Sequence, residues 1–215
     1  MRFSGITPGG KVAAWLAGLA SPPFYGRIGL SRLNRKGYVS PRCTIHHRGL
    51  STGEHVFIDD GVLIYQDRDG GQADIGNRVH IHRMTTLQTG MGGNLRIGND
   101  THIQPRCQFS AYKGPITIGE RVEIAPNCAF YSYNHAIQPD APVREQPVYS
   151  TGGISVGDDV WLGYGVIVLD GVTIGKNAVV GAGAVVTSDI PEGAIAVGTP
   201  ARVIKMRDEL AAETG

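Results

Sequence analysis

Acidic residues are absent from the first quarter of the chain. Residues 1–53 contain eight lysines and arginines but neither Asp nor Glu, whereas the remaining residues carry 12 bases and 19 acids. The formal net charge is only +1. Because the chain as a whole is not basic, we expect no nucleic-acid partner. The basic first segment instead suits an anionic neighbour, such as a membrane surface or a lipid-linked glycan.

Long apolar runs and an even number of cysteines are absent too. The longest apolar stretch near the N-terminus, Val12–Ala20, is too short to cross a bilayer. The Pro22-Pro23 pair that follows it does not resemble a signal-peptide cleavage site. Three cysteines fit a reducing compartment. We therefore expect a cytoplasmic protein, either free or peripheral to the inner face of the membrane.

Charged residues are scarce, at 18% of the chain. Hydrophobic residues make up 41%, which is enough for the core of one domain and argues against disorder. Glycine is abundant, with 31 residues, but there is no Gly-X-Y triplet repeat, so a collagen is excluded. The glycines predict many tight turns.

A six-residue repeat runs through most of the chain. From Val156 the sequence divides into VGDDVW, LGYGVI, VLDGVT, IGKNAV, VGAGAV and VTSDIP. The first position is always aliphatic there, and the fifth is Val, Ala or Ile. Such hexads suit a short strand followed by a tight corner, so three of them form one coil of a triangular solenoid. We expect the first position to face the core and the coils to stack about 4.8 Å apart, as strands do.

The spacing of the coils locates the inserted loops. The coils begin at Thr52, Ile75, Ile97, Ile118, Val156 and Ile174. Most insertions are short, but one covers residues 136–155, directly after His135. Long loops in compact proteins are often functional, so this loop is a candidate for the functional site. Its three prolines predict a stiff loop.

The cysteines fit the repeat. Cys43, Cys107 and Cys128 each occupy the fifth position of a hexad. We expect them to be small core residues, neither catalytic nor joined in a disulfide.

Both ends of the chain carry helical patterns. Lys11–Ala20 has apolar residues at i, i+3, i+4 and i+7, which predicts a short helix that ends before Pro22. It would cap the first coil, contact a neighbouring subunit or lie on a membrane surface. The pattern Val203, Met206 and Leu210 predicts a second helix on the last coil. We expect a cap over 1–38, a β-helix over 39–202 and a C-terminal helix or tail over 203–215.

One outward column of the predicted solenoid is rich in titratable residues. His80 and His102 share the sixth position of adjacent coils, so we expect them to stack, and Glu123 and Trp161 follow in the same column. Three interpretations stay open for this ladder: a polar subunit contact, a metal site, or a binding site for an acceptor substrate.

The segment Ile154–Lys205, with Gly-Thr-Pro-Ala-Arg near its end and Asn134-His135 before the long loop, resembles a known family. It is similar to the hexapeptide-repeat acetyltransferases, in particular galactoside and maltose O-acetyltransferases and the O-acetyltransferases of bacterial polysaccharide synthesis. The resemblance implies an all-β, left-handed parallel β-helix with short terminal helices, assembled as a homotrimer. The handedness comes from the resemblance alone, because parallel crossovers are right-handed in about 98% of cases.

The resemblance also implies roles for individual residues. His135 would be the general base that takes a proton from a sugar hydroxyl, whose oxygen then attacks the thioester carbonyl of acetyl-CoA without an acyl-enzyme. The residues that match coenzyme-binding positions are Trp161, Tyr164, Ala182, Thr187, Ser188, Arg202 and Lys205. Those that match acceptor-binding positions, or neighbour the base, are His102, Gln104, Tyr112 and Asn134. No metal is expected.

These observations predict an acetyl-CoA-dependent O-acetyltransferase that acts on a hydroxyl of a sugar or polysaccharide precursor. An N-acetyltransferase acting on an amino sugar is the nearest alternative. A metalloenzyme of the γ-carbonic-anhydrase kind is another, because those enzymes use three histidines on this fold. A scaffold without catalytic activity is the third.

Overall fold

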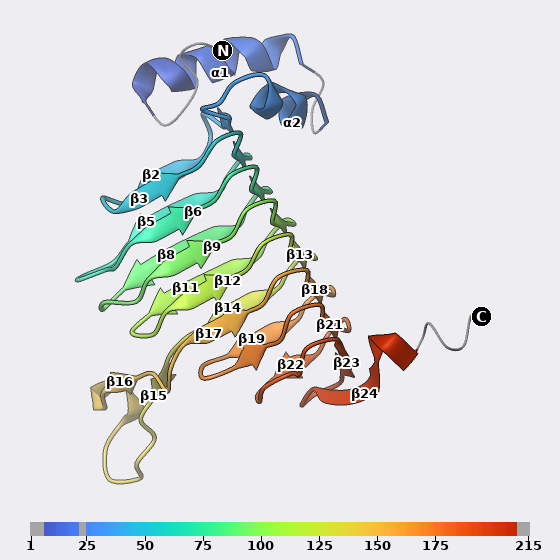
Figure 1. The fold of residues 1–215 in the computed structure, drawn as a ribbon. Coiled ribbons are helices and arrows are strands. Elements are labelled where there is room, and N and C mark those ends of the chain that lie inside the picture. Colours follow the sequence, from blue (N-terminus) through green and yellow to red (C-terminus); the bar gives the residue numbers. More distant parts are fainter. Residues whose placement is uncertain (1–6, 22–24, 210–215) are drawn as a thin grey trace.

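The chain forms a three-sided parallel β-solenoid (Figure 1). The structure is a computed structural model, and it describes residues 7–21 and 25–209. Three sheets run along the solenoid, and successive strands of the chain visit them in turn. Sheet A contains β1 (Tyr38–Val39), β4 (Phe57–Ile58), β7 (His80–Ile81), β10 (His102–Ile103), β13 (Glu123–Ile124), β18 (Trp161–Leu162), β21 (Val179–Val180), β23 (Ala194–Val197) and β24 (Arg202–Met206).

The other two sheets complete each coil. Sheet B contains β2 (Thr44–His46), β5 (Leu63–Gln66), β8 (Thr86–Gly90), β11 (Gln108–Tyr112), β14 (Ala129–Tyr131), β19 (Ile167–Leu169) and β22 (Val185–Val186). Sheet C contains β3 (Leu50–Thr52), β6 (Ala73–Ile75), β9 (Leu95–Ile97), β12 (Ile116–Ile118), β17 (Ile154–Val156) and β20 (Thr173–Ile174). The predicted all-β solenoid of hexads is confirmed.

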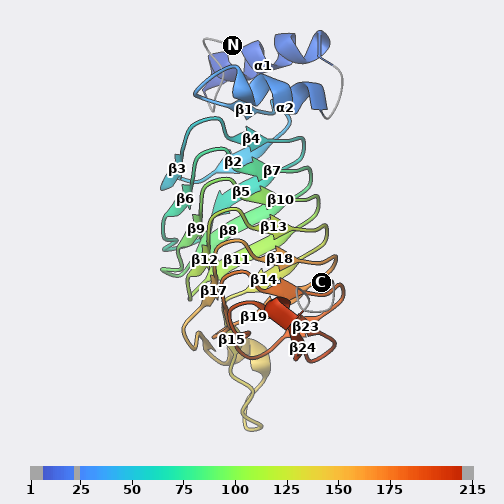
Figure 2. The same ribbon diagram turned by 45° about the vertical axis from the view of Figure 1, so that its right-hand side comes forward.

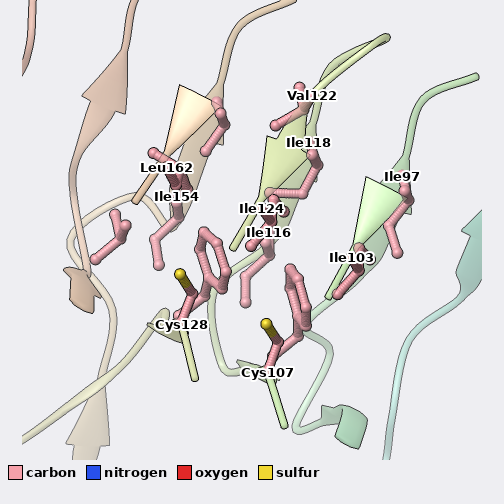
Figure 3. Packing of buried hydrophobic residues seen from close by; sticks show 14 of the residues in the cluster. Ile97, Ile103, Cys107, Ile116, Ile118, Val122, Ile124, Cys128, Ile154 and Leu162 are labelled. Atoms are coloured by element: carbon pink, nitrogen blue, oxygen red, sulfur yellow. The ribbon is translucent and has the colours of Figure 1, made fainter. Parts of the chain in front are cut away.

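The register of the strands matches the predicted coil starts. In sheet C, Thr52 pairs with Ile75, Ile75 with Ile97, and so on through Ile118 and Val156 to Ile174. The first positions of the hexads point inward, where Ile97, Ile103, Ile118, Ile124 and Leu162 pack in the core (Figure 3). Ile154, two residues before the first position Val156, packs in the same core. Stacking like on like keeps the core continuous from coil to coil.

The three cysteines are free and buried in this core, as predicted. The thiol of Cys107 donates to the carbonyl oxygen of Ala125 at 3.3 Å, and that of Cys128 donates to Gly163 at 3.2 Å. Neighbouring coils thus hold the thiols of Cys107 and Cys128 in place within the core (Figure 3).

The corners of the solenoid depend on left-handed backbone at the fourth position of the hexads. There φ is 55° at Arg78, 58° at Asp100 and 62° at Asn127. Gly is favoured at such positions because it has no Cβ to clash, and Gly61 and Gly165 occupy equivalent places with φ of 69°. The repeated corner explains the glycines found at these fourth positions.

All the inserted loops leave the solenoid at the corner between sheets B and C. Three short ones, residues 67–72, 91–94 and 113–115, precede β6, β9 and β12. The long one, residues 132–153, contains the two-stranded ribbon β15 (Asn134–His135) and β16 (Val148–Tyr149) and the 3₁₀ turn η1 (Val143–Glu145). It projects from the body of the solenoid (Figure 1, Figure 2).

The N-terminal helix is confirmed, but its apolar stripe faces outward. Helix α1 (Pro8–Leu19) begins three residues before the predicted start, because Thr7 caps it by accepting a hydrogen bond from the Gly10 amide at 3.2 Å. Ala14 packs with Tyr38 and Phe57 at the end of the solenoid. A second helix, α2 (Tyr25–Arg32), was not predicted. No helix in the described residues has the length and apolar character that a membrane crossing needs.

The predicted C-terminal helix is wrong for Val203 and Met206. Both lie on β24, which runs antiparallel to β23 at the edge of sheet A. The backbone of β24 forms hydrogen bonds with the otherwise unpaired edge of β23. This pairing overrides the weak helical spacing of the apolar residues. Residues 207–209 are helical, and Leu210 lies outside the described residues.

Candidate active site

His135 lies on the ribbon at the base of the long loop. It pairs with Val148 across the antiparallel strands β15 and β16, and the amide of Ala136 donates to the carbonyl of Pro147 at 3.0 Å. Its side chain is exposed. A hexad from Phe130 to His135 would continue the repeat and keep His135 on the coil, but the structure places it outside the coil, on β15. The coil ends at Ser132, whose hydroxyl donates inside the solenoid to the carbonyl of Gly114 at 2.7 Å, and the chain then turns outward.

The carboxylate of Asp170 ties the two ends of the long loop together. Its Oδ2 accepts from the Asn134 amide side chain at 3.0 Å and from the Thr151 backbone at 2.6 Å. Its Oδ1 accepts from the Ser150 hydroxyl at 2.7 Å and from the Gly153 backbone at 2.9 Å. Asp170 therefore holds β15, the strand that carries His135, against the coil that follows the loop.

These contacts also shift the ionisation of Asp170. Burial opposes the charged form, but the hydrogen bonds from Thr151, Ser150 and Gly153 outweigh it, so the pKa of Asp170 lies below its ordinary value. The carboxylate stays charged and remains an acceptor across the neutral range. Asp170 was not predicted, because Asp before Gly at a hexad corner reads only as a turn.

The tip of the loop is braced separately. The side-chain amide of Gln146 donates to the carbonyls of Gln138 at 2.8 Å and Ala141 at 2.6 Å, and its oxygen accepts from the Gln138 backbone at 2.8 Å. Together with the three prolines, this network gives the loop a defined shape.

Tyrosine rings surround the base of the ribbon. The ring centroid of Tyr133 lies 6.1 Å from that of His135 and 5.3 Å from that of Tyr112. Tyr131 lies 6.4 Å from Tyr133. His135 thus stands beside a cluster of aromatic rings. Tyr112 was a predicted acceptor residue, whereas Tyr133 could be found only once the loop's path was known.

The predicted histidine ladder on sheet A is present. The rings of His80 and His102 stack with centroids 4.5 Å apart and planes 8° apart. Nδ1 of His102 lies 2.9 Å from a carboxylate oxygen of Glu123, and Trp161 follows on the next strand. A cavity of about 340 Å³ adjoins the ladder and is lined by Arg32, His55, Arg78, His80, Asp100 and His102.

The two stacked histidines have opposite pKa shifts. The hydrogen bond to Glu123 raises the pKa of His102. Burial, followed by repulsion from His102, lowers the pKa of His80 to about 4. His80 is therefore neutral at pH 7. Within residues 7–21 and 25–209, no group of three or more His, Cys, Asp or Glu side chains is placed to hold a metal ion, so the geometry lends the metalloenzyme alternative no support.

Most of the predicted coenzyme residues gather on sheet A and its corner with sheet B. Trp161 and Tyr164 are 55% and 58% exposed, and the backbone of Tyr164 accepts from Gly183, next to Ala182 in the following coil. Arg202 and Lys205 lie on β24 at the end of the same sheet. Thr187 and Ser188 follow β22 and lie at the corner between sheets B and C.

One chain does not bring all the predicted site residues together. Tyr112 and Asn134 lie with His135 at the corner between sheets B and C. His102 lies on sheet A, as Trp161 does. Gln104 follows directly after the strand of His102. His135 and the sheet A residues thus occupy different sides of the same prism.

Removing the Asp170 anchor should loosen the ribbon. In Asp170→Ala the amides of Thr151 and Gly153 lose their acceptor, so we expect their hydrogen exchange, and that of residues 134–136, to quicken by at least about tenfold. Asp140→Ala, at an exposed acid of the same loop, is the matched control and should leave exchange at these amides unchanged. Equal protection in Asp170→Ala and the control would contradict the anchoring role.

The low pKa of His80 predicts acid destabilisation. Because the folded state holds His80 neutral down to about pH 4, the unfolded chain takes up the proton first, at its ordinary pKa of about 6.5. Stability is thus lost as the pH falls between these two values. We expect His80→Phe, which continues the aromatic column from Phe57, to lose less stability than the wild type between about pH 7 and about pH 5 in urea denaturation.

Two neighbouring histidines, His102 and His82, also make the stability depend on pH. The pair of His102 with Glu123 has the opposite sign: its contribution is complete below the ordinary His pKa and is lost as the pH rises through the raised one. The pKa of His82 is also lowered by burial, so His80→Phe should reduce the acid loss without abolishing it. His46→Gln, at an exposed histidine, should keep the full loss; the same loss in His80→Phe would contradict the assignment.

Comparisons with known proteins agree with this architecture. The family model "Bacterial transferase hexapeptide (six repeats)" matches residues 153–188. The probable acetyltransferase Rv3034c of Mycobacterium tuberculosis is 34% identical over 193 residues, which cover 89% of this chain and 61% of the relative. The chain thus spans about three fifths of that relative's length.

Two solved structures share the fold. The polySia-specific acetyltransferase NeuO is 22% identical with a TM-score of 0.64, over 80% of this chain and 77% of that one. A variant of AntD, an N-acyltransferase from Bacillus cereus, is 24% identical with a TM-score of 0.50, over 83% and 87%. At these identities both bear on the fold alone. The repeat match and the stacked coils together show that the chain is a hexapeptide-repeat β-helix protein, similar to a probable acetyltransferase over most of its length.

Proposed function

We propose that the chain transfers the acetyl group of acetyl-CoA to a hydroxyl of a carbohydrate, with His135 as the general base. The observation that carries the proposal is the anchored ribbon, which presents an exposed imidazole beside tyrosine rings at the corner that bears every insertion. The relative of Mycobacterium tuberculosis is named a probable acetyltransferase, and the AntD structure contains coenzyme A and an amino-sugar nucleotide. These names support a coenzyme A thioester as the acyl donor and a sugar as the acceptor.

The chemistry needs one base and one set of donors. The neutral imidazole takes the proton of the acceptor hydroxyl while its oxygen attacks the carbonyl carbon of the thioester. The tetrahedral oxyanion is stabilised by N–H donors and then collapses, which breaks the C–S bond. The imidazolium returns its proton to the departing thiolate, so the products are the acetyl ester and free coenzyme A. Asn134 and Asp170 act as positioning residues, because they hold the ribbon that bears His135.

The coenzyme would lie along sheet A. Trp161 and Tyr164 offer exposed rings to the pantetheine arm, and Arg202 and Lys205 offer charges to the phosphates. Ala182, Thr187 and Ser188 would add backbone and hydroxyl contacts. The ladder residue His102, together with Gln104 and Tyr112, would contact the acceptor.

Because His135 and the sheet A residues occupy different sides of one prism, we propose that the complete site forms between copies of the chain in a homotrimer. The ribbon of one copy would then reach the sheet A face of its neighbour. The free, buried thiols suit a reducing compartment, and we propose that the protein acts in the cytoplasm.

Replacing the base tests the proposal. We expect His135→Ala to lower turnover by roughly 10²–10⁴ without changing the affinity for coenzyme A, because only proton transfer is lost. The readout is thiol release from acetyl-CoA against a panel of sugars.

A second surface histidine supplies the matched control. His46→Ala, at an exposed histidine of β2, should keep wild-type turnover. A His135→Ala variant that keeps near wild-type turnover with every hydroxyl acceptor would contradict the base assignment. A loss confined to hydroxyl acceptors, with amino sugars still acetylated, would favour the N-acetyltransferase, because an amine needs less help from a base.

A further inference from the structure

Helix α1 presents its large side chains to solvent and its small ones to the solenoid. Val12, Trp15, Leu16 and Leu19 are 59%, 55%, 55% and 70% exposed, although their spacing makes them the apolar stripe of the helix. Gly10 and Ala14 are buried instead. An amphipathic helix normally buries its large apolar residues, so the arrangement of α1 is the reverse of a capping helix.

The small face explains why the helix lies where it does. Ala14 packs with Tyr38 and Phe57, and Ile28 and Leu30 of α2 pack against the same cluster. The end of the solenoid is thus already covered by small residues and by α2. The stripe of α1 is not needed for that cover, and nothing in the described part of the chain packs over it. A continuous row of four large apolar side chains marks an interaction surface.

We propose that the stripe of α1 docks on an anionic lipid surface. Trp and Leu are the side chains that insert into the boundary between headgroups and acyl chains, and a Trp ring suits that boundary because its body is apolar and its N–H is polar. Exposed Leu33, just after α2, adds to the apolar surface at this end. The proposal does not depend on the acetyltransferase activity.

The charges at this end of the solenoid favour lipid over a second copy of the chain. The first 53 residues have no acid of their own. Arg27, Arg35 and Arg42 are paired with acids of the first complete coil, whereas Lys11 of α1 and Lys36, which follows α2, form no ion pair with any described residue. Arg32 lines the cavity beside His80 and His102, so it is not counted among the bases that would meet the lipid. Two copies that met through this end would bring like charges together, whereas an anionic membrane attracts them at about 1 kcal/mol per base.

Docking through this end leaves the candidate active site free. Helix α1 lies at one end of the solenoid, and the ribbon of β15 and β16 lies toward the other end (Figure 1, Figure 2). Coils are about 4.8 Å apart, so the ribbon stands several coils above the docking end. A bound protein would therefore present its sides, not its end, to acceptors near the membrane.

Vesicle co-sedimentation of the full chain tests the proposal. We expect the protein to sediment with vesicles of equal parts phosphatidylcholine and phosphatidylglycerol, to do so far less with phosphatidylcholine alone, and to release as salt screens the charges. Leu16→Ser combined with Leu19→Ser should weaken binding to the mixed vesicles by at least about tenfold, because two inserted side chains are lost. Met84→Ser, at a 63% exposed methionine of the coils, is the control and should bind as the wild type does.

Three results would overturn the proposal. One is equal binding to neutral and mixed vesicles, and another is full binding by the double variant. The third is a smaller oligomer for the double variant in lipid-free buffer, because the stripe would then be a subunit contact. An unchanged melting temperature shows that the double variant is folded, as expected because both leucines are exposed.

Discussion

The stacking of aliphatic side chains inside the solenoid is the constraint on which the other features depend. Each coil places its first-position residues directly over those of the coil before, as the register from Ile75 through Ile97 to Ile118 shows. The backbone of every coil is satisfied by its neighbours, so the parallel sheets need no covering helices. The outward-facing side chains are consequently not needed for the core, so these positions can carry residues for binding and chemistry without loss of the fold.

The sides of the prism differ in what their outward positions carry. The corner between sheets B and C bears all the insertions, and the largest of them is held by the carboxylate of Asp170. Sheet A bears the polar and aromatic column instead, with His102 held by Glu123 and the exposed Trp161 beyond them. A rigid scaffold therefore presents the exposed His135 on a braced ribbon at one corner and a polar and aromatic column on another side of the prism.

The sequence predicted what depends on the period of six and missed what breaks it. The coil starts, the buried cysteines and the stack of His80 on His102 followed from position in the hexad. Asp170 and Tyr133 could not be found in this way, because their partners come from a loop that leaves the repeat. The C-terminal spacing of Val203 and Met206 fitted a helix as well as a strand edge, and only the unpaired edge of β23 decided it. The left-handed sense of the coil stays a prediction from the resemblance.

A crystal structure of the protein with coenzyme A bound tests the central claim most directly. An acceptor oxygen must lie about 3 Å from both the base and the thioester carbon, so the thiol sulfur should lie within roughly 6 Å of the His135 imidazole of some copy in the assembly. The same structure should show the arm of the coenzyme against Trp161. A sulfur that lies far from every His135 ring would contradict the account, whatever the assembly.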